Sequence, residues 1–483
     1  MNKILERYKK LPVQVKASVC FLICSFFQKG ISIITTPIFT RILSTAEYGK
    51  FSVFNSWMQI IAPVISLNLF SGVYSQGIIK FEDDRDRYSS SLQGLSFVLI
   101  SSWLIIYLIF RDTFNSLFLL TTAQMLALIL MVWASGCFSF WSMDQRADFK
   151  YKKLVAITVA VSIFQPLVGI ILVLNSQDKV TARIIGMAAV QLFFYIGAFI
   201  YQMFRGKQFF SKYYWSYALK FNLPLLPHYL SLTVLSSSDR IMINNIAGSD
   251  KAGIYNLAYS VSLIMTIFNT ALLQTIEPWI YRKLKDNKID EISKVAYPCF
   301  VIISGLNILL ILFAPEVIAV FAPKEYHEAI WIVPSVALSV FFMFLYSFFA
   351  TFEFYYEKTK YIAAATVGGA ILNIGLNYVF IHQYGYIAAG YTTLFSYMLY
   401  AFLHYYFMKK ICCQFLNNAK PYNGNLIVLI GIISIVFGFI GLLLYQFPVF
   451  RYSIIVAVIL FMTIFRKRIF MIIKLLISMR RAK

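Results

Sequence analysis

The chain has 483 residues, of which 60% are hydrophobic, 18% are aromatic and 13% are charged, and its formal net charge is +22. A soluble domain of average composition has about 25% charged residues, so this composition excludes a soluble protein. Apolar runs of about 20 residues recur with short polar stretches between them, which leaves no segment long enough for a catalytic domain outside the membrane.

Windows of about 19 residues predict about fourteen membrane-spanning helices, and therefore an all-α polytopic membrane protein. The expected spans lie near 17–40, 51–74, 91–110, 117–141, 154–174, 184–204, 221–244, 253–280, 295–320, 329–350, 361–380, 387–408, 425–445 and 452–465. The last span is short because a basic run at 466–468 ends it, and a basic amphipathic surface helix is expected at 469–479.

The basic residues alternate between the two sides of this predicted topology. The two termini and the even-numbered loops hold 33 Lys and Arg, whereas the odd-numbered loops hold 8. Short loops rich in Lys and Arg stay in the cytoplasm, so both termini are expected there. Topology therefore explains most of the net charge, and no nucleic-acid partner is expected.

Two pairs of glycines indicate an internal repeat. Gly49 and Gly253 are separated by 204 positions, and so are Gly186 and Gly390. Six spans, an even number, separate the repeats, so the halves share one orientation and a pseudo-two-fold axis is expected along the membrane normal. We expect a six-helix bundle at 1–212 and a second at 213–415. Two additional transmembrane helices and a basic cytoplasmic tail are expected at 416–483.

No catalytic or metal-binding pattern is present in the sequence. The four His residues are scattered, the six Cys residues lack metal or redox spacing, and no nucleotide-binding or hydrolase motif occurs. A membrane-embedded glycosyltransferase or polymerase would need a large outer loop, and none exceeds about a dozen residues. The protein is therefore expected not to be an enzyme and to have no catalytic residue, metal or cofactor.

A lysine in the middle of the first span is the first candidate for a functional residue. Ser25, Lys29, Ser32, Thr36 and Thr40 recur at three- and four-residue steps, which places them on one helix face. A lone charge at this depth costs about 2.5–3.5 kcal/mol, so Lys29 is expected to face a water-filled pathway. The alternative is a lysine that snorkels or binds neighbouring carbonyl groups.

The seventh span combines prolines with titratable side chains. Pro224 and Pro227 remove backbone hydrogen bonds, so a kink or hinge suited to a gate is expected, with His228 beside it. The alternative for His228 is a hydrogen-bonded packing residue. Asp239 and Arg240 stand near the outer end of this span, where they form either an internal ion pair or a site whose cation meets an anionic substrate.

The distribution of deep charges favours an anionic passenger. Arg41 ends the first span, while Glu277, Glu316 and Glu353 lie near helix ends. A cation exporter would be expected to place carboxylates deep in its pathway, and this chain places Lys29 there instead.

Three stretches, in order, resemble the Wzx-type polysaccharide repeat-unit flippases, whose superfamily includes multidrug exporters and lipid II flippases. Residues 37–51 read PIFTRILSTAEYGKF. Residues 239–242 read DRIM, followed by GIYNLAY at 253–259. Residues 313–318 read FAPEVI, followed by KEY at 324–326. The resemblance extends over about twelve spans, and the two last spans depart from the twelve-span pattern of that family.

The resemblance implies two six-helix bundles around a cationic central cavity that opens to either side in turn. It implies an undecaprenyl-pyrophosphate-linked oligosaccharide, an O-antigen or capsule repeat unit, as substrate, with Lys29, Arg41 and Arg240 neutralising the pyrophosphate. Coupling to a proton or sodium gradient is expected by analogy, and other polysaccharide-assembly membrane proteins are expected partners. A small-molecule or multidrug exporter of the same fold is the alternative function.

Overall fold

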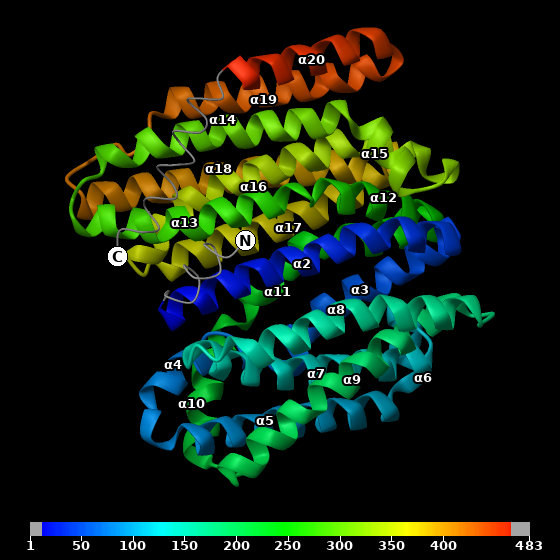
Figure 1. Ribbon diagram of the computed structural model, residues 1–483, viewed down its shortest axis with the longest axis vertical. Helices are drawn as coiled ribbons and strands as arrows, with labels where there is room; N and C mark the ends of the chain where they lie inside the picture. Colours follow the sequence, from blue (N-terminus) through cyan, green and yellow to red (C-terminus); the bar gives the residue numbers. More distant parts are fainter. Residues whose placement is uncertain (1–11, 465–483) are drawn as a thin grey trace, which may run out of the picture. The chain divides into compact units, whose positions relative to one another are not determined.

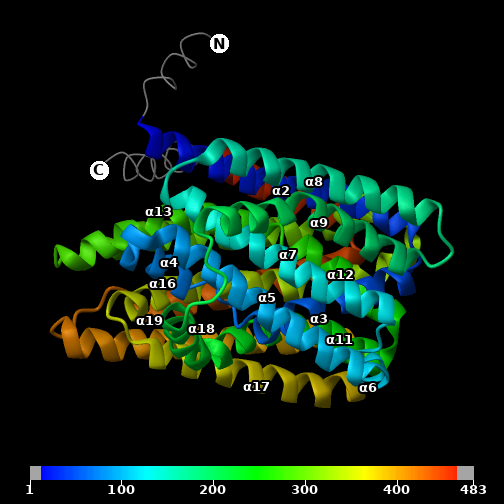
Figure 2. The same ribbon diagram turned by 90° about the horizontal axis from the view of Figure 1, so that it is seen from below.

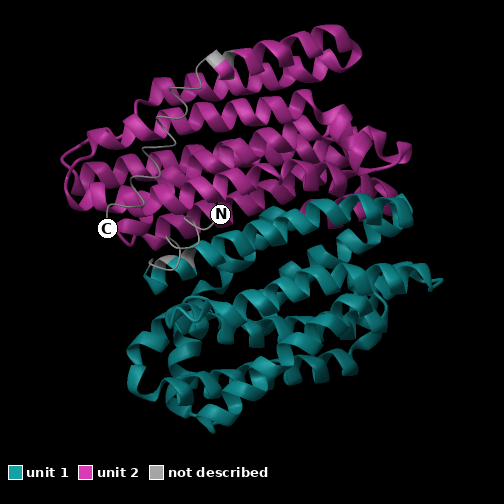
Figure 3. Cartoon of the chain, in the orientation of Figure 1, with its two compact units in different colours: residues 1–237 teal, residues 238–483 magenta. Residues whose placement is uncertain are grey.

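The computed structural model describes residues 12–464, and the expected tail helix at 469–479 lies outside this range. The chain forms two compact units, Met1–Ser237 and Ser238–Lys483 (Figure 3). All regular elements of the described residues are helices, as expected from the composition. The division at 212 and 415 that the sequence predicts stays a prediction.

Unit 1 is built from long helices joined by short turns (Figure 1). Its elements are α2 (Val13–Ile42), α3 (Thr45–Ser66), α4 (Val73–Lys80), η1 (Glu82–Asp84), α5 (Arg85–Ile109), α6 (Arg111–Phe118), α7 (Thr122–Ala147), α8 (Tyr151–Leu174), α9 (Lys179–Gly206), α10 (Lys212–Asn222) and η2 (Leu223–Leu225). The following helix, α11 (Leu226–Ala247), runs from unit 1 into unit 2.

Helix α9 is the centre of unit 1. It packs against α5, α7 and α8, and α2 packs against α8. Close approach of α8 and α9 requires a residue without a side chain, because a Cβ atom on Gly186 would lie 3.3 Å from the backbone of Gly169. Figure 2 shows α5 and α7 from a second direction. The apolar core between α3, α5, α7 and α9 fixes the ends of these helices.

Unit 2 is also built from helices joined by short turns. Its elements after α11 are α12 (Ser249–Ser262), α13 (Met265–Lys285), α14 (Asp290–Leu312), α15 (Ala314–Phe321), η3 (Lys324–Trp331), α16 (Val333–Tyr355), α17 (Thr359–Tyr384), α18 (Ala388–Phe415), α19 (Gly424–Leu443), η4 (Leu444–Gln446) and α20 (Pro448–Ile464). Helix α16 is the most buried and packs against α12, α13, α14, α17, α18 and α19.

Each expected span overlaps a helix, and ten candidate spans among the described residues are long and apolar enough to cross a membrane. Helices α3, α11 and α18 are long but do not reach the same apolarity, and α20 is shorter. A multi-pass, all-helical membrane protein is therefore confirmed, whereas the count of fourteen spans is not.

The two units share a packing order that suits the expected repeat. In unit 1, α9 packs against α7 and α8, and in unit 2, α18 packs against α16 and α17. Gly49 and Gly253 are both buried and lie one turn inside α3 and α12, respectively. The pseudo-two-fold relation itself stays a prediction.

An ion pair joins the start of α12 to η3 in unit 2. Lys251 Nζ lies 2.9 Å from Glu328 Oε2, and the Tyr386 hydroxyl donates to the same oxygen. These two hydrogen bonds hold the pKa of Glu328 below its usual value. A carboxyl with a lowered pKa stabilises the folded state above its unfolded pKa of about 4.3, and this stabilisation is lost as the pH falls through the folded value.

We therefore expect Glu328→Gln to lower the melting temperature of the purified protein by the same small amount at pH 6, 7 and 8. Below about pH 4.3 the difference from wild type should shrink, and it should vanish once the pH has fallen through the lowered pKa of Glu328 in the folded state, because the wild-type carboxyl is then protonated as well. Thermal unfolding of both proteins in detergent across this pH range measures the difference in melting temperature. A difference that persists unchanged at pH 3.5 would contradict the role of the Glu328 charge.

Candidate functional site

A buried carboxylate in unit 2 is the centre of the candidate site. Asp239 on α11 is fully buried, and three neutral groups donate to it. Tyr255 on α12 and Thr393 on α18 donate to Oδ2 over 2.7 and 2.9 Å, and Asn377 on α17 donates to Oδ1 over 2.6 Å. Four helices of unit 2 therefore meet at one carboxylate.

A second layer of polar side chains surrounds this carboxylate. The Asn377 amide also donates to Asn373 Oδ1 over 3.2 Å, and Thr392 donates to Asn377 Oδ1. Ser238 and Ser396 both lie 3.4 Å from the Asn373 amide. Asn373 and Asn377 are four residues apart on α17, so both project from one face of the helix. These side chains are all buried, and they form one continuous polar network.

The chemistry of this network suits a small cation. Its potential ligands are carboxylate, amide and hydroxyl oxygens, which are the groups that hard cations prefer. Rotating the Asn377 amide by half a turn directs its oxygen, in place of its NH₂, toward Asp239. The single carboxylate carries one negative charge, which matches a monovalent cation or a proton. No cluster of three His, Cys, Asp or Glu side chains that would hold a transition metal occurs among residues 12–464.

Arg240 binds other side chains than Asp239 does. Arg240 is 7% exposed, and its guanidinium donates from Nε to Asn256 Oδ1 over 3.1 Å and lies 3.9 Å from the centre of the Tyr259 ring. Helix α12 therefore contacts both Asp239 and Arg240. Tyr255 binds Asp239, while Asn256 and Tyr259 bind Arg240. Asp239 and Arg240 therefore bind different side chains of α12.

The separate partners predict the outcome of a double-mutant experiment. Asp239→Ala and Arg240→Ala should each reduce transport more than tenfold, because each leaves buried polar groups without a partner. The double variant should transport no faster than the less active of the two single variants. Transport by each variant is measured as surface polysaccharide in a strain that lacks the native gene, and an immunoblot checks the amount of each variant protein in the membrane. Recovery of activity in the double variant would mean that the two residues serve only as an ion pair.

Pro224, Pro227 and His228 lie at a break in the helix, as the proline spacing predicts. Helix α10 ends at Asn222, the short η2 contains Pro224, and α11 begins at Leu226 with Pro227 and His228 in its first turn. The buried Asn222 amide donates to the carbonyl oxygens of Leu67 and Asn68, over 2.9 and 2.8 Å. These two bonds anchor the break to the turn after α3. His228 is half-buried beside Tyr229.

Lys29 and Arg41 both lie on α2, which is the least buried of the candidate spans. The Lys29 side chain is half-buried. Two hydroxyls of its stripe bond within the helix: Ser25 donates to Phe21 O over 3.0 Å and Thr36 to Ser32 O over 2.8 Å. Those two hydroxyls therefore do not need water. Arg41 is exposed and donates to Pro37 O over 2.8 Å.

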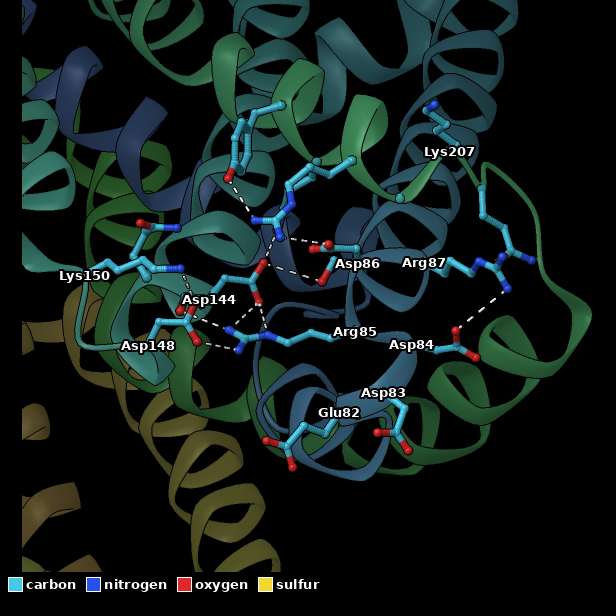
Figure 4. A pocket seen from close by; sticks show the side chains of 17 residues that line it. Glu82, Asp83, Asp84, Arg85, Asp86, Arg87, Asp144, Asp148, Lys150 and Lys207 are labelled. Atoms are coloured by element: carbon cyan, nitrogen blue, oxygen red, sulfur yellow. Dashed lines mark hydrogen bonds and ion pairs between the residues drawn. The ribbon is translucent and has the colours of Figure 1, made fainter.

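A charged cavity of about 980 Å³ lies in unit 1, at the start of α5 and the ends of α7 and α9 (Figure 4). Arg85 lies between Asp144 and Asp148, at 3.2 and 2.6 Å, and Lys150 is 2.8 Å from Asp148. Two further ion pairs in the cavity are Arg87–Asp84 and Arg205–Asp86. Because most of its charges are paired with each other, this cavity joins helix ends and is not the candidate site.

The sequence identified Asp239 and Arg240 but missed the other side chains of the cluster, Tyr255, Asn373, Asn377, Thr392 and Thr393. One signal was available: Asn373 and Asn377 are polar residues at a four-residue step within an apolar span. The others come from helices distant in sequence, and only the packing of unit 2 brings them together.

Comparisons with known proteins agree with this fold. The family described as "Polysaccharide biosynthesis protein" matches residues 15–284, and the MatE family matches residues 224–379. A relative from Haemophilus influenzae, "Lsg locus putative protein 1", is 23% identical over 385 residues, which is 74% of this chain and 89% of that protein.

Two solved structures share the fold at low sequence identity. The lipid II flippase MurJ in an inward closed conformation has a TM-score of 0.68 and 14% identity, covering 87% of this chain and 98% of that one. An inward-facing multidrug resistance MATE family transporter of the MOP superfamily has a TM-score of 0.64 and 13% identity, covering 80% and 95%. Since the family match spans more than half of the 483 residues, the chain belongs to the polysaccharide biosynthesis protein family.

Proposed function

We propose that the protein moves an undecaprenyl-pyrophosphate-linked oligosaccharide from the cytoplasmic to the periplasmic leaflet of a bacterial inner membrane. The match of residues 15–284 to a polysaccharide biosynthesis family carries the proposal. A pyrophosphate with a sugar headgroup does not cross hydrocarbon unaided, so its charge must be met inside the membrane. Lys29, Arg41 and Arg240 are the cations assigned to this role, and the excess of Lys and Arg in alternate loops supports cytoplasmic termini.

The driving force in this proposal is a cation gradient that acts through Asp239. The carboxylate links α11, α12, α17 and α18, so binding or release of a proton or sodium ion changes what holds these four helices together. The break at Pro224 and Pro227 lies at the start of the same helix, α11, and supplies the hinge of the gate. His228 at that break is assigned to titrate during the cycle.

Deletion of the gene in its own host tests the proposal. We expect loss of surface polysaccharide together with complete lipid-linked units that accumulate on the cytoplasmic side of the inner membrane. Restoration by a plasmid copy is the control for effects on neighbouring genes. Normal surface polymer, with intermediates distributed as in the parent strain, would contradict the assignment.

A small-molecule exporter of the same fold is the second candidate function, favoured by the MatE match at residues 224–379. The two candidates differ in the charge of the passenger. A cation exporter predicts that the deletion strain becomes more sensitive to cationic compounds, whereas the flippase predicts unchanged sensitivity once membrane integrity is taken into account.

A further inference from the structure

A groove in unit 2, between α18 and α19, has no role in the function proposed above. Both helices pack on α16, which forms the floor. The groove has a volume of about 1050 Å³, and its floor includes Phe342, Leu345 and Phe349. Its walls include Phe402 and Ile432, which are 61% and 52% exposed. Apolar walls that remain exposed beside an apolar floor suit a hydrocarbon chain.

The end of this groove near the loop between α18 and α19 has a different chemistry. Lys409 and Lys420 lie there with exposed side chains, together with Asn423 and Asn425. Tyr422 also lines the groove, is 3% exposed, and its hydroxyl has no hydrogen-bond partner among residues 12–464. A buried hydroxyl without a partner costs free energy, so a polar ligand atom in the groove would stabilise the protein.

The length of the groove matches one leaflet of a bilayer. Its lining residues on α18 run from Met398 to Cys412, a rise of about 21 Å at 1.5 Å per residue. Half of a bilayer, with its headgroup region, is about 20–22 Å thick. The groove is therefore long enough for one lipid that stays in a single leaflet, with its headgroup at the lysines.

We propose that this groove binds an anionic glycerophospholipid of the membrane, with an acyl chain over α16 and its phosphate at Lys409 and Lys420. Basic pockets between membrane helices are typical sites for such headgroups. The chain's own tail does not suit this place, because residues 465–483 carry seven Lys and Arg and no acidic residue. A translocated lipid does not suit it either, because both lysines lie at one end and give the phosphate no partner farther along.

The test is native mass spectrometry of the purified full-length protein from nanodiscs that contain equal amounts of phosphatidylglycerol and phosphatidylethanolamine. We expect the wild type to retain phosphatidylglycerol preferentially. The preference of the double variant K409Q/K420Q for phosphatidylglycerol should be about 25-fold lower, because each lysine contributes a factor of about five. The matched control K285Q/K288Q removes two exposed lysines of the same unit and should change nothing.

A second variant tests the apolar part of the groove. A Cβ atom on Gly431 would lie in ordinary contact, 3.6 Å from the Phe342 ring, so G431F directs a ring into the groove from a position that accepts a Cβ atom. The G431F variant keeps Lys409 and Lys420 and should retain less of both lipids. Equal retention in K409Q/K420Q and the control, or no preference in the wild type, would overturn the proposal. Displacement of phosphatidylglycerol by a polyprenyl pyrophosphate at equal concentration would also overturn it, because the groove would then be a substrate site.

Discussion

Replacing Asp239 with Asn is expected to abolish transport while the protein remains folded in the membrane. The substitution keeps the size of the side chain and removes only its charge. Tyr255 and Thr393 can turn their hydroxyls to accept hydrogen bonds from the new amide, so unit 2 keeps its packing. A cation bound by the cluster loses its only carboxylate, and the affinity should fall on the order of a hundredfold.

Two measurements check this prediction. Surface polysaccharide in the deletion strain reports transport, and the melting temperature of purified protein with sodium or choline chloride at equal ionic strength reports cation binding. A site filled at about 100 times its Kd stabilises the folded state by about 2.7 kcal/mol, which a thermal scan resolves. If sodium binds at Asp239, the wild type should be stabilised and Asp239→Asn should not. If a proton is the coupling ion, sodium stabilises neither protein, and transport alone is lost.

The control for this prediction is Asp286→Asn, which removes an exposed carboxylate at the end of α13. It should behave as wild type in both measurements. Full transport by Asp239→Asn would show that the cluster only joins helices, and the driving force would then have to act elsewhere.

Replacing Lys29 with Ala should reduce transport tenfold to a hundredfold, because one charge-assisted contact to a phosphate contributes about 1.5–3 kcal/mol. Membrane insertion should improve or stay unchanged, since a charged side chain within a span is costly. Lys29→Arg should keep part of the activity. Lys152→Ala, an exposed lysine on α8, is the matched control. Transport measured as surface polysaccharide per unit of membrane protein checks the prediction, and full activity of Lys29→Ala would remove this residue from the pathway.

The sequence was most informative where the physical cause is local. The break between α10 and α11 follows from Pro224 and Pro227, since proline removes a backbone donor wherever it stands. The spans also have a local cause, the apolar composition of each segment, and each expected range overlaps a helix. Asp239 and Arg240 stood out because ionisable residues are rare in apolar segments.

The remaining parts of the site depend on packing between distant segments. Asn377 and Thr393 lie 138 and 154 positions from Asp239, and each is an ordinary polar residue by itself. The buried pair of Glu353 and His404 is a similar case: Oε1 and Nδ1 lie 2.7 Å apart although the residues are 51 positions apart. The polar stripe on the first span is the opposite case, because Ser25 and Thr36 donate their hydroxyls to carbonyl oxygens within α2 and do not need a water-filled pathway.

The most direct test of the proposed function is a flipping assay with the purified full-length protein in liposomes that contain an undecaprenyl-pyrophosphate-linked oligosaccharide. An impermeant reagent that oxidises sugars modifies only the outer leaflet, which holds about half of the lipid in protein-free vesicles. With wild-type protein and a cation gradient, we predict modification of nearly all the lipid, and with Asp239→Asn only half. Modification that stays at half with the wild type, under sodium and proton gradients alike, would contradict a flippase.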